Sequence, residues 1–476
     1  MKNFILLILS ICFSTNIFAA VTLPKILGSN MILQQQSNVN LWGKAKPNCK
    51  VKITASWSSD KIQTQSDNEG RWAVKIATPA ASFTPHTIVI SDGEKLQLDN
   101  ILIGDVWICS GQSNMEMPVM GFNNQSVEHS LEHIIAAKAL ENNIHSFKVG
   151  WARSYDKEQE DCVSGEWLSA SSESIANLSA TAYYFAYHLT KALNIPIGVI
   201  TPYWGGTRIE SWMSLGALRE CVTPEQYEQK QNCHSIKPSE LYCAMIAPIR
   251  NFTAKGFIWY QGESNLGDND HYETMMARMV SQWRNDWEDK NNSMPFYYVQ
   301  IAPYTYGNSK EIAYPRFVES QVRALDIIPN CGMATTTDLG LEYSIHPHKK
   351  LEVGQRLAAL ALTQTYGLKG FGPKAPLMDS YEIKDGKVII SFRNAERGLI
   401  PWEEGPAFGF EVAGADRVFH PAKVQVSDKR VFVWSDEVKE PVAARYSFHN
   451  YAPGNLKSTY GIAVPPFRTD NWNDVK

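Results

Sequence analysis

Short runs of alternating apolar and polar residues fill residues 21–100, and turn residues such as Lys46-Pro47-Asn48 separate them. The runs cover Asn38–Trp42, Val51–Ala55, Trp72–Ile76 and Thr87–Ser91. Alternation at period two buries one face of a strand, and several short strands at close spacing are typical of a small β-sandwich. We therefore expect a β-sandwich-like domain over residues 21–100.

The pattern changes over residues 101–370, where short apolar runs alternate with stripes of helical spacing. Phe185, Leu189 and Leu193 fall on one helical face and precede the apolar run Ile197–Ile200. A second stripe, which precedes the run Phe296–Ile301, consists of Tyr272, Met276, Met279, Val280, Trp283 and Trp287. Strands that alternate with helices build a parallel sheet covered on both faces. We expect an α/β domain here.

Alternating runs return over residues 371–476, which we expect to form a β-rich domain. These runs are Val388–Phe392, Phe408–Val412, Val431–Trp434 and Ala443–Phe448. At the other end, Lys2, the apolar run Phe4–Phe13 and the small residues before Val21 are typical of a secretory signal over residues 1–20. The apolar run is shorter than the roughly 20 residues of a membrane span. Export to the periplasm or the medium is therefore predicted, with no membrane association after removal of the signal.

The amino-acid composition limits the kinds of binding partner that we expect. The chain has 45 Lys and Arg against 49 Asp and Glu, without a basic block, so nucleic acid is not an expected partner. Its 14 Trp and 20 Tyr serve either core packing or stacking on sugar rings. Cys109, inside an apolar run, is expected to be a buried thiol. Cys221 and Cys233 could close a small loop in an oxidising compartment.

Three polar motifs follow three predicted strands. Ser113 follows the run Val106–Cys109, Gly205-Gly206 follows Ile197–Ile200, and Gln261 follows Gly256–Tyr260. Ligands of open α/β sheets bind at the carboxyl ends of the strands, so the motifs are expected to share one site. Gly111 allows the tight turn that a serine nucleophile needs.

A serine needs a base to take its proton, and His346 is our candidate among 11 histidines. His346 precedes Pro347, which suits the first turn of a helix that ends before Gly367. The buried face of that helix is expected to carry Val353, Leu357, Leu360 and Ala361. Backbone N–H groups of Ser113 and of Gly205 or Gly206, with the Gln261 amide, are the expected oxyanion donors.

Several polar neighbours have two interpretations. Gln261 is an oxyanion donor or ties one loop to another, and Asn265 is a weaker candidate donor. Glu263 braces the loops, for example through Ser264, or acts as the base itself. Arg208 holds an acidic substrate or forms a structural salt bridge. His346 and His348 do not share a helix face and lack a completing ligand cluster, so no metal and no cofactor are expected.

The motif blocks together resemble the sialate O-acetylesterase family of SGNH-type hydrolases. They are Gly111-Gln112-Ser113-Asn114-Met115, Trp204-Gly205-Gly206-Thr207, Gln261-Gly262-Glu263-Ser264-Asn265 and Ile345-His346-Pro347, with landmarks such as Met31–Gln34 and Pro466–Asp470. The resemblance implies a flavodoxin-like three-layer α/β/α domain with flanking β-domains. It also implies Ser113 as nucleophile, His346 as base, and Gly205, Gly206 and Gln261 as oxyanion residues. Gln112 is a candidate supporting or substrate-binding residue.

One departure from the family pattern concerns the third catalytic residue. Relatives often carry an aspartate shortly ahead of the histidine, where this chain has Tyr343 and Ser344, three and two residues before His346. Asp338 and Glu342 are the nearby carboxylates. We favour a serine–histidine dyad in which a backbone carbonyl orients the imidazole.

The expected function is removal of O-acetyl groups from sialic acids or related glycans through an acetyl-serine intermediate. An esterase for acetylated xylan or another polysaccharide is the alternative within enzymes. A sugar-binding protein on a hydrolase frame that has lost catalysis is the alternative from another class. The sequence leaves open the hydroxyl position that is deacetylated and the oligomeric state.

Overall fold

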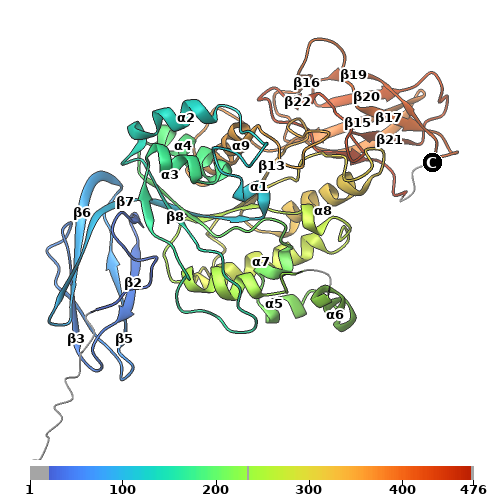
Figure 1. Ribbon diagram of the computed structural model, residues 1–476. Coiled ribbons are helices and arrows are strands. Elements are labelled where there is room, and N and C mark those ends of the chain that lie inside the picture. The colour runs from blue at the N-terminus through green and yellow to red at the C-terminus, as the bar shows by residue number, and fades with distance from the viewer. Residues whose placement is uncertain (1–20, 233–234, 473–476) are drawn as a thin grey trace, which may run out of the picture.

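A computed structural model describes residues 21–232 and 235–472 of the chain (Figure 1). The centre is a sheet with the strand order β13 (Cys331–Ala334), β12 (Phe296–Val299), β11 (Gly256–Tyr260), β7 (Lys95–Gly111), β10 (Ile197–Thr201), β8 (Ile144–Lys148) and β9 (Trp167–Ser169). Neighbours from β13 to β8 are parallel, which confirms the predicted parallel sheet. The edge strand β9 is antiparallel to β8, so the sheet as a whole is mixed.

Helices cover both faces of this sheet. The pair α4 (Ala180–Leu193) and α9 (Lys350–Gln364) packs on one face, and the pair α7 (Tyr272–Asp286) and α8 (Ala313–Ile327) packs on the other (Figure 1). Along β7, Trp107 belongs to the core under α4 and α9, whereas Ile108 belongs to the core on the α7 side. Alternate side chains of one buried strand thus serve two cores, as expected for an α/β layer structure.

Strand β7 joins the first part of the chain to the central sheet. Its beginning pairs antiparallel with β6 (Ser82–Ser91), and its end pairs with β10 and β11. Strand β6 continues to β3 (Lys50–Ala55) and β4 (Ile62–Gln65), β1 (Ile32–Gln34) lies parallel to β7, and β2 (Asn38–Lys44) pairs with β5 (Arg71–Ala77). All four predicted N-terminal strands are confirmed. The strand nevertheless runs straight through position 100, where we expected the first domain to end.

The last part of the chain is β-rich, as predicted, and lies at the opposite end of the molecule from the N-terminal strands (Figure 1). One sheet has the order β14 (Leu377–Lys384), β15 (Lys387–Arg393), β20 (Arg430–Trp434), β19 (Lys423–Ser427). A second has the order β18 (Phe419–Pro421), β17 (Phe410–Ala413), β21 (Ala443–Tyr446), β23 (Phe467–Arg468), and β16 (Leu399–Pro401) pairs with β22 (Leu456–Ser458). Val388, Val412 and Val433 belong to a core of their own.

The remaining α-helices are short: α1 (Ser113–Glu116), α2 (Ser130–Ala136), α3 (Ser172–Asn177), α5 (Leu215–Arg219) and α6 (Pro224–Asn232). One helix boundary was predicted wrongly, because α9 begins at Lys350 and His346 therefore lies in the loop before it. The buried face of α9 does carry the four residues predicted for it. Within the described part of the chain, we find no helix with the length and apolar character of a membrane span.

Two expectations fall on residues that the structure does not describe. The secretory signal over residues 1–20 lies outside the described residues, and so does Cys233, with which Cys221 could pair. Cys109 is fully buried and unpaired, as predicted, and burial raises the pKa of its thiol far above the ordinary value.

Candidate active site

A tight turn after β7 presents Ser113. Gly111 has φ +147°, and a Cβ on it would lie 2.1 Å from the carbonyl oxygen of Tyr260 in β11. The next residue, Gln112, donates its N–H to that same oxygen at 3.0 Å. Only glycine allows two neighbouring strands to approach this closely at the turn. Ser113 then begins α1, so its own N–H has no acceptor within the helix.

The loop after β10 lies against this turn. Trp204 donates its N–H to the Gly111 carbonyl at 3.1 Å, and a Cβ on Gly205 would lie 3.3 Å from Ser113 Cβ. The Gly205 N–H donates to Glu116 Oε2 at 2.6 Å, so it is engaged rather than free to receive an oxyanion. Burial raises the pKa of Glu116. Among the predicted backbone donors, Ser113 and Gly206 fit the role better than Gly205.

His346 is held by a residue that sequence reasoning missed. Its Nδ1 lies 2.6 Å from Gln125 Oε1, and its ring meets Phe122 edge to face at 5.3 Å. Because an amide oxygen only accepts hydrogen bonds, Nδ1 carries the proton and Nε2 keeps its lone pair. Nε2 is buried and has no hydrogen-bond partner among the described residues. Burial, with a smaller effect of Lys350, lowers the pKa of His346 to about 4, so the ring is neutral near pH 7.

A buried network ties the serine turn to the histidine loop. Asn114 donates from Nδ2 to the Ile345 carbonyl at 3.0 Å and to Glu263 Oε1 at 2.5 Å. Lys350 donates from Nζ to Asn114 Oδ1 at 2.5 Å, and neither Asn114 nor Lys350 is exposed to solvent. Burial lowers the pKa of Lys350 to about 7 and raises that of Glu263. The neighbours of Ser113 and His346 in sequence are therefore in contact, although the two loops are far apart along the chain.

Glu263 contacts Asn114 rather than Ser264, which agrees with the first of its two interpretations, that of bracing the loops. The two carboxylates considered as third catalytic residue lie elsewhere. Asp338 forms two hydrogen bonds of 2.7 Å with Arg356 and an ion pair of 2.6 Å with Lys457. Burial opposes ionisation of Asp338, yet these two cations lower its pKa to about 2.

Glu342 interacts with Tyr343 beside it and does not contact His346 in the described structure. Both carboxylates are thus corrected as partners of the imidazole. The expected backbone carbonyl is corrected as well, because the side-chain oxygen of Gln125 takes that position. No local pattern around Gln125 announces this role, since the two residues are 221 positions apart.

Gln261 ties loops together. Its Nε2 donates to the Thr207 carbonyl at 3.0 Å and to Asn265 Oδ1 at 2.7 Å, and its Oε1 accepts from the Tyr272 hydroxyl at 2.8 Å. Both amide protons are therefore committed inside the protein. The expectation that this amide is a third oxyanion donor is wrong in this geometry, and its loop-tying alternative describes it better.

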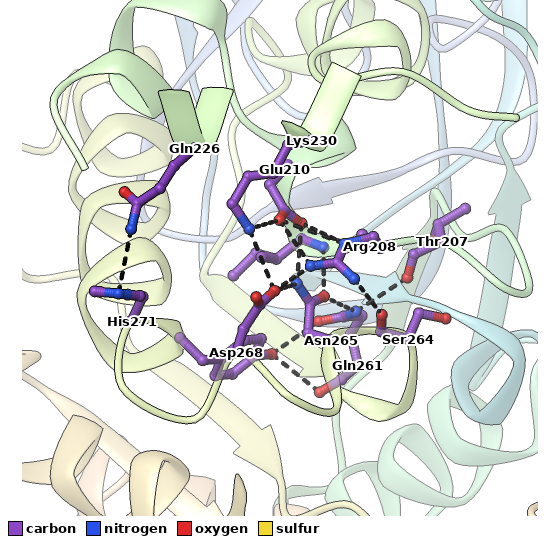
Figure 2. Close-up of polar contacts among 12 residues, drawn as sticks. Thr207, Arg208, Glu210, Gln226, Lys230, Gln261, Ser264, Asn265, Asp268 and His271 are labelled. Atoms are coloured by element: carbon purple, nitrogen blue, oxygen red, sulfur yellow. Dashed lines mark hydrogen bonds and ion pairs between the residues drawn. The ribbon is translucent and has the colours of Figure 1, made fainter. Parts of the chain in front are cut away.

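Arg208 belongs to a largely buried ion cluster (Figure 2). It pairs with Glu210 and Asp268, and Lys230 pairs with the same two carboxylates. Burial alone raises the pKa of Glu210, but Arg208 and Lys230 lower it to about 2. Asn265 donates to both carboxylates at 3.0 Å. The structural salt bridge is thus the right interpretation of Arg208, and Asn265 braces the cluster.

Gln112 also holds the frame, because its Oε1 accepts the N–H groups of Gly262 and Ser264 at 3.3 Å each. His348 pairs through Nε2 with Glu128 at 2.9 Å. Over residues 21–232 and 235–472, no group of three or more His, Cys, Asp or Glu side chains is arranged to hold a metal ion. The arrangement offers a serine at a turn and a neutral imidazole, the two groups that acyl transfer requires.

Comparisons with known proteins agree with this chemistry. Residues 103–363 match the family model of carbohydrate esterases described as sialic acid-specific acetylesterase. Sialate O-acetylesterase of Homo sapiens is 29% identical over 399 residues, which cover 77% of this chain and 75% of that protein. The Mus musculus sialate O-acetylesterase is 27% identical over 439 residues, with 79% of this chain and 80% of that protein covered.

A solved structure extends the likeness to the whole fold. The carbohydrate acetylesterase from Xanthomonas citri is 32% identical, with a TM-score of 0.86, 95% of this chain and 100% of that chain covered. These relatives are hydrolases, so the alternative of a non-catalytic sugar-binding protein is not supported. The chain belongs to the family of carbohydrate esterases described as sialic acid-specific acetylesterases.

Proposed function

We propose that the protein removes O-acetyl groups from a sialic acid or a related glycan through an acetyl-serine intermediate. One observation carries the proposal: the hydrogen bond from Asn114 to the Ile345 carbonyl joins the Ser113 turn to the loop of His346, whose Nε2 has no hydrogen-bond partner in the described structure, Ser113 included. A neutral imidazole beside a serine turn is the arrangement of a general base and its nucleophile.

In the first half-reaction, Ser113 Oγ attacks the acetyl carbonyl carbon while its proton passes to His346 Nε2. The carbonyl electrons move to the oxygen, and we assign the N–H groups of Ser113 and Gly206 as the donors that receive that charge. The tetrahedral intermediate then collapses, the bond to the sugar oxygen breaks, and His346 returns the proton to the departing hydroxyl. Acetyl-serine and free sugar result.

In the second half-reaction, His346 takes a proton from water, the hydroxide attacks the acetyl carbon, and Ser113 leaves with the proton. Acetate is released. Throughout, Gln125 Oε1 accepts from Nδ1–H and fixes the ring orientation. An amide oxygen stabilises the imidazolium less than a carboxylate does, so we infer a serine–histidine dyad with a base of low pKa.

The fold and location of the protein complete the proposal. We propose an SGNH-type, flavodoxin-like catalytic domain over residues 101–370, a β-sandwich-like domain over residues 21–100 and a β-rich domain over residues 371–476. The strand β7 shared by the first two supports a rigid connection between them. Export through a signal over residues 1–20 remains part of this proposal.

The test compares Ser113→Ala with Ser380→Ala, a control at an exposed serine of β14. Acetate release is measured on O-acetylated N-acetylneuraminic acid, acetylated xylan and 4-nitrophenyl acetate. We expect Ser113→Ala to lose at least about 10³-fold in kcat on every substrate. A serine-directed phosphonate should label the control and not Ser113→Ala. Turnover retained by Ser113→Ala with a normal unfolding profile would refute the proposal.

A further inference from the structure

Two tryptophans form a platform at the edge of the sheet where the catalytic candidates lie. Trp151 follows β8 and Trp204 follows β10, and their rings stack with centroids 5.5 Å apart and planes at 21°. Trp151 is 50% exposed, although its Nε1 donates to the Tyr203 carbonyl at 3.1 Å. A large apolar ring that is fixed in place and still exposed is prepared to stack on a ligand.

The platform adjoins Ser113. Strands β8 and β10 are parallel, with Lys148 opposite Thr201, so the loops after both strands leave the sheet at the same edge. The Trp204 N–H donates to the carbonyl of Gly111, two residues before Ser113, and a Cβ on the neighbouring Gly205 would lie 3.3 Å from the serine Cβ. The platform and the serine turn are therefore on adjoining loops at one edge of the sheet.

Two cations border the tryptophans. The Arg153 guanidinium lies 5.1 Å from the Trp204 ring centroid, and Lys148 Nζ lies 5.5 Å from that of Trp151. Both side chains are exposed, and neither forms an ion pair with a described residue. Arg153 uses Nη1 to donate to the Ser235 carbonyl at 3.0 Å, which holds the side chain in place and leaves its other donors available.

Lys148 interacts electrostatically with Glu116. Oε2 of Glu116 accepts the Gly205 N–H, and the charge of Glu116 is directed toward the serine turn. Arg153 has no such acidic neighbour among its described partners, and its one hydrogen bond goes to a backbone carbonyl. A guanidinium matches the geometry of a carboxylate and can bind it through two parallel hydrogen bonds.

We propose that Trp151, Trp204 and Arg153 form a subsite for a sugar that carries its own carboxylate. The tryptophans stack on the sugar, Arg153 pairs with the carboxylate, and the O-acetyl group of the same sugar is held at Ser113. Lys148 adds positive charge at the rim. This subsite rests on the proposed function, because it assigns the acetyl group to Ser113, and it gives that function a preference for acidic over neutral acetylated sugars.

The experiment measures acetate release by the wild-type protein, Arg153→Met and Trp151→Ala. The substrates are O-acetylated N-acetylneuraminic acid, its methyl ester, which lacks the negative charge, and 4-nitrophenyl acetate. Arg430→Met is the matched arginine control, since Arg430 lies on the Phe432 ring in the C-terminal part of the chain. Trp402→Ala is the tryptophan control, because Trp402 is 51% exposed and has Lys457 Nζ 4.7 Å from its ring centroid.

We expect the wild type to prefer the acid over its methyl ester, and Arg153→Met to abolish that preference. The KM of Arg153→Met for the acid should rise about tenfold, the change expected for loss of one charged hydrogen bond, and its kcat should stay nearly unchanged. Trp151→Ala should raise KM for acid and ester alike. Neither variant should change kcat/KM for 4-nitrophenyl acetate by more than about twofold, and both controls should behave as wild type.

Equal kcat/KM for acid and methyl ester in the wild type would overturn the proposal. An Arg153→Met variant that keeps the preference would do so too, as would equal losses on all three substrates. These results are distinguishable from failure of the proposed function. If Ser113 is not the nucleophile, the Ser113→Ala protein retains turnover whatever Arg153 and Trp151 do.

Discussion

Replacing Lys350 tests whether the buried network beneath the site is what joins serine and histidine. Lys350→Met keeps the length and apolar stem of the side chain and removes the amine. Asn114 Oδ1 then loses its donor, and Glu263 stays buried without the cation nearest to it. The variant therefore disturbs the contact between the two loops without touching either reacting residue.

The expected loss can be worked from these contacts. Lys350 and Glu263 form no direct ion pair, but they attract each other across Asn114; removing one of two coupled buried charges costs up to about 3–5 kcal/mol, because the other charge is left uncompensated. The orphaned Asn114 oxygen accounts for about 1–3 kcal/mol within that range. Glu263→Gln alone leaves the opposite buried charge at Lys350 and should cost a similar amount. The double variant Glu263→Gln/Lys350→Met has no buried charge in the network, so its loss should be close to that of one single variant.

The assay is urea unfolding of the four proteins at pH 6.5, where an amine of pKa about 7 is mostly protonated. Lys423→Met is the control, because Lys423 is a lysine 60% exposed in a surface pair with Asp436. A surface pair contributes about 0–1 kcal/mol, so this variant should unfold almost as the wild type does. Losses that simply add in the double variant would refute the coupling of Glu263 and Lys350.

Activity supplies a second readout of the same variant. His346 acts as a base only when neutral, so kcat/KM should fall as the pH falls through its folded pKa of about 4. The Lys350 charge contributes to that low pKa, after burial. Lys350→Met should therefore move the acid limb to higher pH, and the looser loops should lower kcat by up to about 10²-fold. An acid limb at the wild-type pH, with unchanged kcat, would contradict the positioning role. The double variant keeps this readout accessible should the single variant fail to fold.

Further predictions concern substitutions of Gln125, of the Gly205-Gly206 pair and of Arg208. Gln125→Glu places a carboxylate at His346 Nδ1, which should raise the pKa of the imidazole and move the acid limb of the pH–kcat/KM profile up by about 1–3 units. Gly205→Ala should lower kcat about tenfold, because the new Cβ would lie 3.3 Å from Ser113 Cβ. Gly206→Ala adds a Cβ in open space, but at φ +72°, so it should lower the free energy of unfolding by about 1–2 kcal/mol and leave kcat largely unchanged. Arg208→Met should lower the free energy of unfolding by about 3–5 kcal/mol without changing KM for an acidic substrate; a KM effect in folded protein would restore its substrate-binding role.

The periodicity of hydrophobic residues predicted most helices and strands, because it shows which side chains of an element are buried, and that pattern follows from the geometry of the element itself. The stripe that starts at Tyr272 became α7, and the apolar run at Ile197 became β10. The pattern could not show that β7 is one strand across position 100. Its first half is half-exposed and alternating, its second half is buried on both faces, and the two halves look like separate elements in sequence.

Partners of polar side chains were less predictable, because contacts between distant segments decide them. Pro347 suited a helix start, but the Asn114–Ile345 bond and the bond from His346 N–H to Ser344 Oγ hold that segment as a loop, and α9 begins later. The shared edge of the sheet was predictable, since the three motifs all follow parallel strands. The roles within it were not, as Gln125 and Gln261 illustrate.

The residues that hold this site together differ from those proposed to react in whether their hydrogen-bond donors and acceptors already have partners within the protein. Gln261 and Asn265 have both amide protons bonded within the protein, so a substrate could engage them only by breaking a buried bond. His346 Nε2 is buried and unpaired within the described structure, a state that costs free energy and is expected where a proton must be accepted. Two kinds of polar residue that look alike in the sequence are thus distinguished by whether their donors and acceptors are already committed. Glu263 Oε2 is also buried without a partner, so the criterion supports His346 as the proposed base only together with its link to the Ser113 turn, and it assigns to the surrounding amides the task of keeping the two loops together.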